Sequence, residues 1–477
     1  MLGDIFNIII GVNRMGEIIY NITAIFQIFV FMITCYYLFL GIFGVYRKKE
    51  VKNYKPKNRF AMIVAAHNEE VVIGKLIESM KCQNYPKELF DVFVIADNCD
   101  DKTAEIARGY GVTVCERTND EQKGKGFALE WMFNKLFEME KQYDAVTIFD
   151  ADNVLSKDFL KEINSKMQEG YNVVQGYIDS KNPDDSWIAT SYSIAFWSQN
   201  RMFQLARNNI GFSNQIGGTG FSIATETLKK LGWGVSCLTE DLEFTCKLLL
   251  NGEKVGWAHD ARIYDEKPLK LKQSWIQRRR WMQGFTDVAT RYFFKLTIKA
   301  IKERKWYIFD AGLYILQPFV TLLLGVSTVM AMVQSRMPHG ADIFLISDML
   351  GNVGFKIFVL IQFILTPLVL IMDKKISKGV FAMLVLFSSN VFLFPLLFDG
   401  IKDGVVLLLI NVGYYAIFLI ATYVLLGKRS LIFFWRYLLY GIYTLTWIPI
   451  TVQGIHRRKN KEWNPTKHVR NVEICDV

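Results

Sequence analysis

AVTIFDADN, residues 145–153, is an apolar β-rich run that ends at two aspartates, and it decides how the first half of the chain folds. Three similar runs precede it, and a segment with helical spacing separates each run from the next. Alternating strands and helices predict an α/β domain with a mostly parallel, Rossmann-like sheet and helices on both faces. The predicted strands are 59–66, 91–96, 112–115 and 145–149, and the predicted helices are 70–81, 102–108 and 126–137.

Polar residues follow three of these strands at the point where each strand ends. Ligands of parallel sheets bind beyond the carboxyl ends of the strands, so we expect these side chains to line one crevice. They are His67, Asn68, Asp97, Asp150 and Asp152. No GxGxxG sequence follows the first strand and GxxxxGK[ST] is missing, which argues against dinucleotide binding and P-loop hydrolysis.

Asp150 and Asp152 are two carboxylates two residues apart at a strand end. A divalent cation that bridges two phosphates, Mg²⁺ or Mn²⁺, takes hard oxygen ligands of this kind and keeps part of its water. The alternative is an ordinary polar turn, in which Asp and Asn are common. The pair is therefore a candidate metal site.

Two further motifs lie downstream. Thr239-Glu240-Asp241 precedes an apolar-periodic stretch, so it is either a helix N-terminus with a Thr cap or the position of a carboxylate base. In Gln277-Arg278-Arg279-Arg280-Trp281, the first, fourth and fifth residues share one helix face. That face offers an amide, a guanidinium that suits a diphosphate and an aromatic plate for a sugar. The alternative is a basic amphipathic helix on anionic lipid.

Long uncharged runs mark membrane segments. The chain is 51% hydrophobic and 21% charged, and about 20 apolar residues span a bilayer. Lysines and arginines follow the first run closely, so the positive-inside rule predicts an outside N-terminus and explains the net charge of +10 without nucleic acid as a partner. The runs are 18–46, 311–333, 357–372, 379–398, 404–427 and 437–455.

The expected organisation follows from these runs. We predict an extracytoplasmic N-terminus (1–17), a first transmembrane helix (18–46), a cytosolic domain (47–305), a membrane region with four or five segments (306–455) and a basic cytosolic tail (456–477). Six spans would place this tail outside, so 430–455 is predicted to be re-entrant or interfacial, or another span is miscounted. Ser388, Ser389 and Asn390 inside one span either line a polymer path or make helix contacts.

Taken in order, the acidic strand ends, Asp-X-Asp, Thr-Glu-Asp and Gln-X-X-Arg-Trp before membrane helices resemble the processive, membrane-embedded family 2 glycosyltransferases. These are the cellulose, chitin, hyaluronan and mixed-linkage glucan synthases, and the motifs cover roughly 60–285. The resemblance implies a cytosolic GT-A-like domain, with interface helices near 187–207 and 271–300, in a multi-pass plasma-membrane protein.

The resemblance also implies roles for individual residues. Asp241, within Thr239-Glu240-Asp241, is implied as the general base, and Asp150 and Asp152 as the ligands of Mg²⁺ or Mn²⁺. The implied donor contacts are His67, Asn68, Glu69, Asp97, Lys125, Gln277 and Arg280, and of these Asn68, Glu69 and Asp97 are implied to lie near the uridine. The implied acceptor contacts are Trp281, Gly218 and Thr219.

The implied activity is inverting polymerisation of a UDP-sugar into a β-linked polysaccharide that crosses the bilayer. Asp97-Asn98-Cys99-Asp100-Asp101 replaces the commoner Asp-Asp-Gly-Ser, which indicates a side branch and weakens any transfer of sugar identity. A β-glucan from UDP-glucose is preferred, and hyaluronan, chitin and poly-N-acetylglucosamine stay open. So do non-processive transfer to a lipid carrier and a transporter or scaffold that senses nucleotide sugars. A homo-oligomer and a secretion partner are undecided.

Overall fold

The computed structural model describes residues 2–48, 54–234, 237–336, 342–398, 400–459 and 470, apart from the side chains of 2–14. The chain divides into two compact units. The sheet unit consists of Phe43–Pro318 and Pro449–Val477, and the helical unit of Met1–Ile42 and Phe319–Ile448. Most of the predicted basic tail lies outside the described residues.

The four predicted strands form one half of the sheet. β1 (Phe60–Ala66) pairs in parallel with β2 (Phe90–Asp97) and with β4 (Ala145–Asp150), and β2 pairs in parallel with β3 (Thr113–Arg117). Each strand ends within two residues of its predicted bounds. The prediction of a mostly parallel sheet is therefore confirmed for this half.

The other half was not predicted as strands, and it makes the sheet mixed. The order is β3-β2-β1-β4-β7-β6-β8-β5. β7 (Phe221–Ala224) is antiparallel to both β4 and β6 (Val173–Ser180), so β6 runs in the same direction as β4. β8 (Val255–Asp265) is parallel to β6 and antiparallel to the short β5 (Val154–Leu155). The carboxyl ends of β1, β4, β6 and β8 therefore meet at one edge.

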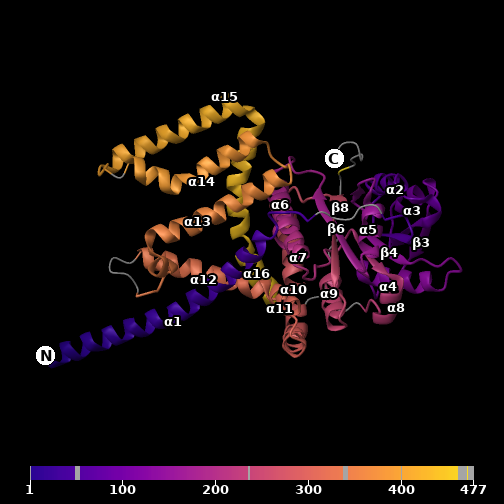
Figure 1. Ribbon diagram of the computed structural model, residues 1–477, viewed down its shortest axis with the longest axis horizontal. Coiled ribbons are helices and arrows are strands. Elements are labelled where there is room, and N and C mark those ends of the chain that lie inside the picture. The colour runs from indigo at the N-terminus through magenta and orange to yellow at the C-terminus, as the bar shows by residue number, and fades with distance from the viewer. Residues whose placement is uncertain are drawn as a thin grey trace. The chain divides into compact units, whose positions relative to one another are not determined.

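Helices cover both faces of the sheet (Figure 1). The alternation of side chains along β1 explains this, because Phe60, Met62 and Val64 pack into one core while Ala61 and Ile63 pack into the other. The first core takes side chains of α2 (Ile73–Lys81), α3 (Thr103–Gly109) and α5 (Phe159–Gln168). The second takes side chains of α4 (Lys125–Phe137), α8 (Thr225–Leu231) and α9 (Glu240–Leu250).

Two long helical segments complete the sheet unit. One runs without interruption through α6 (Trp187–Ser198), the π-helical η2 (Gln199–Leu205) and α7 (Ala206–Asn209). The other is α10 (Leu271–Glu303), followed by α11 (Trp306–Ile315); a short 3₁₀ turn, η1 (Lys87–Leu89), precedes β2. Both segments predicted as interface helices are therefore helical, and contact with a membrane interface stays a prediction.

A buried ion pair joins these two segments. Arg207 Nε and Nη2 donate to Asp310 Oδ2 and Oδ1 at 2.7 and 2.8 Å, and both residues are 1% exposed. A bidentate guanidinium–carboxylate pair fixes orientation as well as distance. The pair also explains why the apolar run predicted at 311–333 does not begin a span there, because its first residues belong to a helix that packs on the sheet unit.

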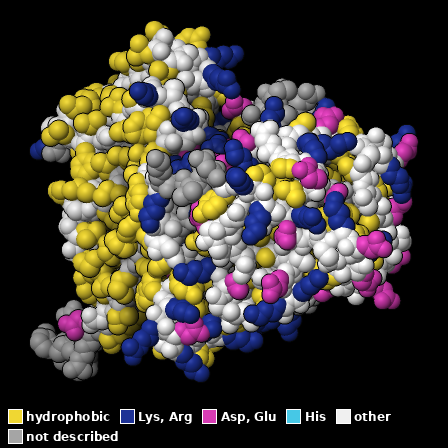
Figure 2. Space-filling view, turned by 45° about the vertical axis from the view of Figure 1, so that its right-hand side comes forward, with side chains coloured by type: hydrophobic (Ala, Val, Ile, Leu, Met, Phe, Trp, Pro, Cys, Tyr) yellow, Lys and Arg dark blue, Asp and Glu magenta, His cyan; other side chains and the backbone are white. Residues whose placement is uncertain are grey.

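The helical unit holds the candidate membrane spans. Five helices in the described residues are long and apolar enough to cross a membrane, at 15–42, 317–336, 346–372, 378–398 and 404–456. Figure 2 shows hydrophobic side chains gathered over this part of the surface. The helices are α1 (Leu2–Ile42), α12 (Gln317–Arg336), α13 (Ile346–Met372), α14 (Lys378–Phe398), α15 (Gly404–Leu445) and α16 (Trp447–His456), whose last residues belong to the sheet unit.

Several helix boundaries differ from the sequence-based expectations. α1 already begins at Leu2, so most of the predicted N-terminal segment 1–17 is helical. α11 ends before Pro318, which cannot donate a backbone hydrogen bond and starts a new helix in its first turn. Within α15, Gly427 has φ 80° and ψ 171°, a conformation that suits glycine, and it splits the helix in two. Residues 430–455 therefore form the end of α15 and most of α16, and their re-entrant or interfacial position stays a prediction.

The polar residues of α14 make helix contacts. Ser388 and Ser389 donate to the carbonyl groups of Leu384 and Val385 in their own helix. Asn390 Oδ1 accepts a hydrogen bond from the Tyr414 hydroxyl of α15 at 2.6 Å. These contacts match the alternative of a structural role, and nothing in them supports a polymer path.

Asp310→Asn is expected to lower the free energy of unfolding by about 3–5 kcal/mol, because it leaves a buried guanidinium without its countercharge. Chemical denaturation of the detergent-solubilised protein measures this. Glu116→Gln is the matched control, since it breaks the exposed pair between Arg108 and Glu116 and should cost less than about 1 kcal/mol. Equal effects of the two substitutions would contradict the structural role of the buried pair.

Candidate active site

The loops after β1 and β2 are tied to each other at the carboxyl edge. The His67 Nδ1 atom lies 2.8 Å from the Asp97 carbonyl oxygen. The Asp100 backbone N–H donates to Asn68 Oδ1 at 3.0 Å, and Asn68 has a φ of 56°, which Asn tolerates better than most residues. The edge predicted to hold the uridine is therefore a pair of fixed turns.

Asp97 is buried at this edge and carries a partner that the sequence reasoning missed. Arg117, at the end of β3, donates to Asp97 Oδ1 at 2.6 Å, and both side chains are less than one-tenth exposed. The Glu69 backbone N–H donates to Thr103 Oγ1 at 2.8 Å, which holds the start of this loop. The donor contacts predicted for His67, Asn68, Glu69 and Asp97 remain predictions, and the structure brings these residues together.

The two aspartates after β4 differ in their surroundings. The Asp150 carboxylate is 40% exposed and accepts from Lys125 Nζ at 2.5 Å. Asp152 is 5% exposed; its Oδ1 accepts from the Asn153 amide at 3.2 Å and its Oδ2 from the Glu266 backbone N–H at 3.0 Å. Asp150 is therefore the more accessible carboxylate, and Asp152 is held rigidly behind it.

This pair fits a cation that arrives with a diphosphate. In the described residues, no group of three or more His, Cys, Asp or Glu side chains is arranged to hold a metal by itself. Mg²⁺ at nucleotide sites is commonly held by one or two carboxylates, substrate phosphates and water. Asp150 and Asp152 offer carboxylate oxygens of this kind, and their role as metal ligands stays a prediction.

Thr219 supports the metal pair. Its hydroxyl accepts from the Asp150 backbone N–H at 3.0 Å and donates to Asn153 Oδ1, and the residue is 3% exposed. The Thr219 hydroxyl therefore already has two hydrogen-bond partners. The acceptor contact predicted for Thr219 stays a prediction. Its neighbour Gly218 has a φ of 84°, and a Cβ there would lie 3.3 Å from Asp241 Oδ2. The glycine therefore leaves room beside the predicted base.

Asp241 lies in the first turn of α9, and its surroundings favour the neutral acid. Burial, and then the charge of neighbouring Glu240, raise the pKa of Asp241 to about 7. Burial also raises the pKa of Glu240. Thr239 occupies the N-cap position, but its side chain makes no capping hydrogen bond. The alternative of a simple Thr cap is therefore not what the structure contains.

Lys125 connects the metal pair with the predicted base. Besides Asp150, its ammonium donates to the Gly218 carbonyl oxygen at 2.6 Å. The charges of Asp150, Glu240 and Asp241 raise the pKa of Lys125 against the opposing effect of burial, which is the largest single influence. One ammonium thus interacts with both sets of carboxylates.

The Gln277–Trp281 face of α10 is formed as predicted. Gln277 Oε1 accepts from the Tyr192 hydroxyl at 2.8 Å, and Trp281 packs edge-to-face on Tyr192 and Phe196 with ring centroids 6.0 and 6.2 Å apart. The charge of Arg280 also reaches Glu240, whose pKa it lowers. Glutamine, arginine and tryptophan therefore share one face of α10, and Arg280 lies near the motif that contains the predicted base.

Gly284 brings α10 against the start of α9. A Cβ at this position would lie 2.4 Å from Thr239 Oγ1 and Cγ2, so only glycine allows the two elements to approach this closely. The close contact sets the distance between the base motif and the Gln277–Trp281 face.

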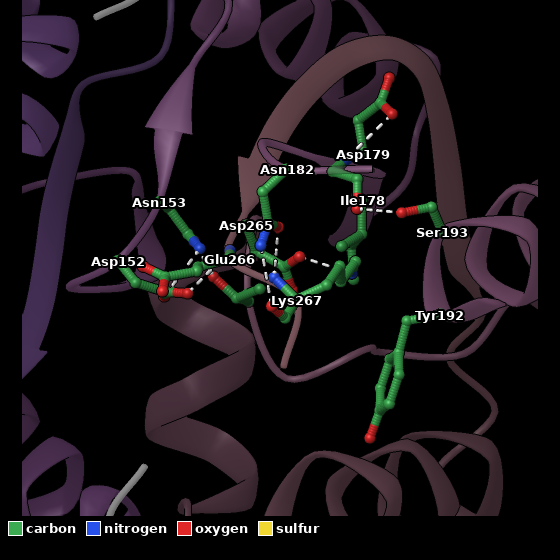
Figure 3. A network of polar contacts seen from close by, with 12 residues as sticks. Asp152, Asn153, Ile178, Asp179, Asn182, Tyr192, Ser193, Asp265, Glu266 and Lys267 are labelled. Atoms are coloured by element: carbon green, nitrogen blue, oxygen red, sulfur yellow. Dashed lines mark hydrogen bonds and ion pairs between the residues drawn. The ribbon is translucent and has the colours of Figure 1, made fainter. Parts of the chain in front are cut away.

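Figure 3 shows the loop after β8, with Asp265, Glu266 and Lys267. The sequence did not predict this loop. The Asn182 side chain clasps it by accepting from the Lys267 N–H at 2.8 Å and donating to the Lys267 carbonyl at 2.9 Å. Lys267 Nζ pairs with Asp265 Oδ1 at 2.5 Å. Burial raises the pKa of Asp265 to about 6. Only the consecutive Asp265-Glu266 pair hinted at this loop in the sequence, and β8 itself was not predicted.

Comparisons with known proteins agree with this geometry. Residues 56–284 match the family model described as Glycosyltransferase like family 2. The mannosyltransferase PcManGT from Pyrobaculum calidifontis, solved with GDP-Man and Mn²⁺, superposes with a TM-score of 0.50 at 16% identity, over 81% of this chain and 100% of that one. The match to the glycosyltransferase family 2 model lies within the sheet unit, and this unit has the mixed, Rossmann-like sheet of the GT-A fold, so the predicted fold class is confirmed.

Two curated relatives are similar over more than half of the chain. A beta-monoglucosyldiacylglycerol synthase of Trichormus variabilis is 26% identical over 62% of this chain. A poly-beta-1,6-N-acetyl-D-glucosamine synthase of Staphylococcus aureus is 26% identical over 58% of it. The chain covers 63% and 66% of these relatives' own lengths, so just under two thirds of each.

The pH dependence of kcat/KM is expected to follow Asp241. A base with a pKa of about 7 loses about tenfold in rate for each pH unit below that value. Glu240→Gln removes a neighbouring negative charge, which lowers the pKa of Asp241 and moves the acidic limb to lower pH. Glu226→Gln, which removes the charge of an exposed side chain of α8, is the control and should leave the limb in place. An acidic limb that Glu240→Gln does not move would contradict this assignment.

Proposed function

We propose that the protein is a membrane-embedded, processive, inverting glycosyltransferase that polymerises a UDP-sugar into a β-linked polysaccharide and moves it across the bilayer. The observation that carries the proposal is the bridge made by Lys125, which contacts Asp150 and the Gly218 carbonyl beside Asp241. Glycosyl transfer needs a site for the metal and the diphosphate close to a carboxylate base, and here both lie within reach of one ammonium.

The reaction is a single displacement. Asp241 accepts the proton of the acceptor hydroxyl, the hydroxyl oxygen forms a bond to the anomeric carbon, and the bond from that carbon to the diphosphate breaks, so that UDP leaves with the electron pair. The raised pKa of Asp241 makes it a stronger base than an ordinary aspartate. A divalent cation bound with the diphosphate would stabilise the charge on the leaving group. Arg280 is the proposed protein cation for the same charge.

The donor is proposed to be a UDP-hexose, with UDP-glucose preferred. The two relatives are, by name, a glucosyl and an N-acetylglucosamine synthase, which favours this class of donor. The Mn²⁺ of the Pyrobaculum mannosyltransferase supports a divalent cation, Mg²⁺ or Mn²⁺, at Asp150 and Asp152.

A sugar chain is the proposed acceptor. Trp281, Tyr192 and Phe196 form an aromatic group beside the Gln277 amide, and aromatic faces suit the apolar faces of a sugar ring. The basic residues after α1 favour a cytosolic sheet unit. The last turns of α10 alternate the exposed Phe294, Ile298 and Ile301 with lysines, which favours contact with a lipid surface.

A second candidate is transfer of one sugar to diacylglycerol, which the name of the Trichormus relative favours. The two candidates differ in product. Purified protein is offered each UDP-hexose with and without diacylglycerol, and UDP release, product length and sensitivity to linkage-specific hydrolases are measured. Polymer from one donor supports the proposal, a monoglycosylated lipid supports the second candidate, and absence of UDP release with every donor supports a non-enzymatic scaffold.

Asp150→Asn is expected to reduce activity in Mg²⁺ or Mn²⁺ by on the order of 10²-fold, because a neutral amide is a poorer ligand for a hard cation. UDP release over a metal titration is the measurement. Asp158→Asn, an exposed aspartate, is the control. Full turnover of the wild type in excess chelator would sink the metal assignment.

Trp281→Ala is expected to block polymer formation more than hydrolysis of the UDP-sugar. Water still reaches the anomeric carbon, whereas an acceptor sugar loses its stacking surface. Misplacement of the acceptor by about 1 Å can lower the rate of transfer by on the order of 10²-fold. UDP release and polymer are measured in one sample. The control is Trp275→Ala, which removes another indole of α10, one that donates to Gln453. It should leave the ratio of polymer formed to UDP released unchanged. Equal loss of both activities in Trp281→Ala would mean that this indole holds the fold or the donor.

A further inference from the structure

Lys181 lies at the carboxyl edge of the sheet, directly after the end of β6. This strand runs in the same direction as β4, so Lys181 belongs to the same edge as Asp150 and Asp152. No sequence motif singles it out, and it has no role in the reaction described above.

The backbone around Lys181 is fixed from both sides. Its N–H donates to the Asp265 carbonyl oxygen at 2.9 Å. The next residue, Asn182, clasps the Lys267 backbone through two hydrogen bonds. The lysine side chain therefore extends from a rigid backbone, which fixes the direction in which it can reach a ligand.

The Lys181 ammonium is buried without a hydrogen-bond partner in the described part of the chain. The residue is 8% exposed, and Nζ contacts no acceptor there. Burial lowers the pKa of Lys181, and the charges of Asp152, Glu266, Asp265 and Glu69 oppose that shift. A buried, unpaired ammonium is costly, so it calls for acceptor oxygens from elsewhere.

The surrounding carboxylates are already engaged. Asp152 accepts from Asn153 and from the Glu266 N–H, and Asp265 pairs with Lys267. Glu266 Oε2 accepts from the backbone N–H of Arg470 at 2.9 Å. Lys181 thus has carboxylates nearby that bind other donors, while its own three N–H groups stay open.

We propose that Lys181 binds a phosphate oxygen of the donor's diphosphate. The inference rests on the proposed UDP-sugar donor. The position fits, because Lys181 interacts with Glu69, predicted to lie near the uridine, and with Asp152 of the metal pair, and the diphosphate links these two parts of a bound nucleotide. Lys181 is thus a donor-binding residue beyond those of the motifs.

The test is nucleotide binding without turnover. Wild type, Lys181→Met and Lys181→Gln are titrated with uridine, UDP and UDP-glucose in saturating Mg²⁺, by calorimetry and by displacement for the weak ligand. Loss of one hydrogen bond to a charged group should weaken UDP and UDP-glucose by about 10- to 100-fold in Lys181→Met and spare uridine. Lys161→Met, which removes an exposed lysine of α5, is the control.

The other outcomes overturn the inference. If UDP and UDP-glucose both bind unchanged, Lys181 is a counter-ion. If only UDP-glucose binding is weakened, Lys181 is a sugar contact. If both variants lose uridine binding together with UDP binding, Lys181 is a structural residue. A wild type that binds no UDP at all would instead contradict the proposed function, so the two failures can be told apart.

Discussion

The site depends on one electrostatic constraint, which is that three carboxylates, those of Asp150, Glu240 and Asp241, must stay close together around Lys125. Lys125 resolves it by donating to Asp150 and to the Gly218 carbonyl while its charge reaches Glu240 and Asp241. Burial, and then the like charge of Glu240, favour protonation, which is why the pKa of Asp241 rises to about 7. Burial and the charge of Glu240 thus suit Asp241 to its proposed role as the base, and Asp150 is the carboxylate proposed to bind the cation.

Close backbone approach holds the parts of this site at fixed distances. Gly284 lets α10 touch the start of α9, and Gly218 leaves space beside Asp241. The bidentate pair of Arg207 and Asp310 fixes the helical segment that carries Tyr192, against which Trp281 packs. The proposed acceptor surface is therefore part of a continuous packed framework, and the same contacts position this surface and the proposed base.

The sequence predicted the parallel half of the sheet and the motif residues, because hydrophobic runs and short local motifs are visible without tertiary structure. β6, β7 and β8 were missed, since their pairing is antiparallel or long-range and β7 has only the four residues Phe221–Ala224. Arg117 and Lys181 were missed for the same reason: each is one basic residue at a strand end, and only the fold shows what it faces. The apolar run 311–333 was predicted as one segment from its composition, but the chain breaks near Pro318 and the run belongs to two helices.

The most direct test of the central claim is the configuration and length of the product. Protein in liposomes is given α-linked UDP-glucose labelled with ¹³C at the anomeric carbon, then chased with unlabelled donor under enzyme dilution, and products are resolved by length and by NMR. The account predicts β-linked chains that keep growing on the same enzyme during the chase, with one UDP released per sugar and none in Asp241→Asn. Products with α-linkages, or single-sugar products that never extend, would contradict it.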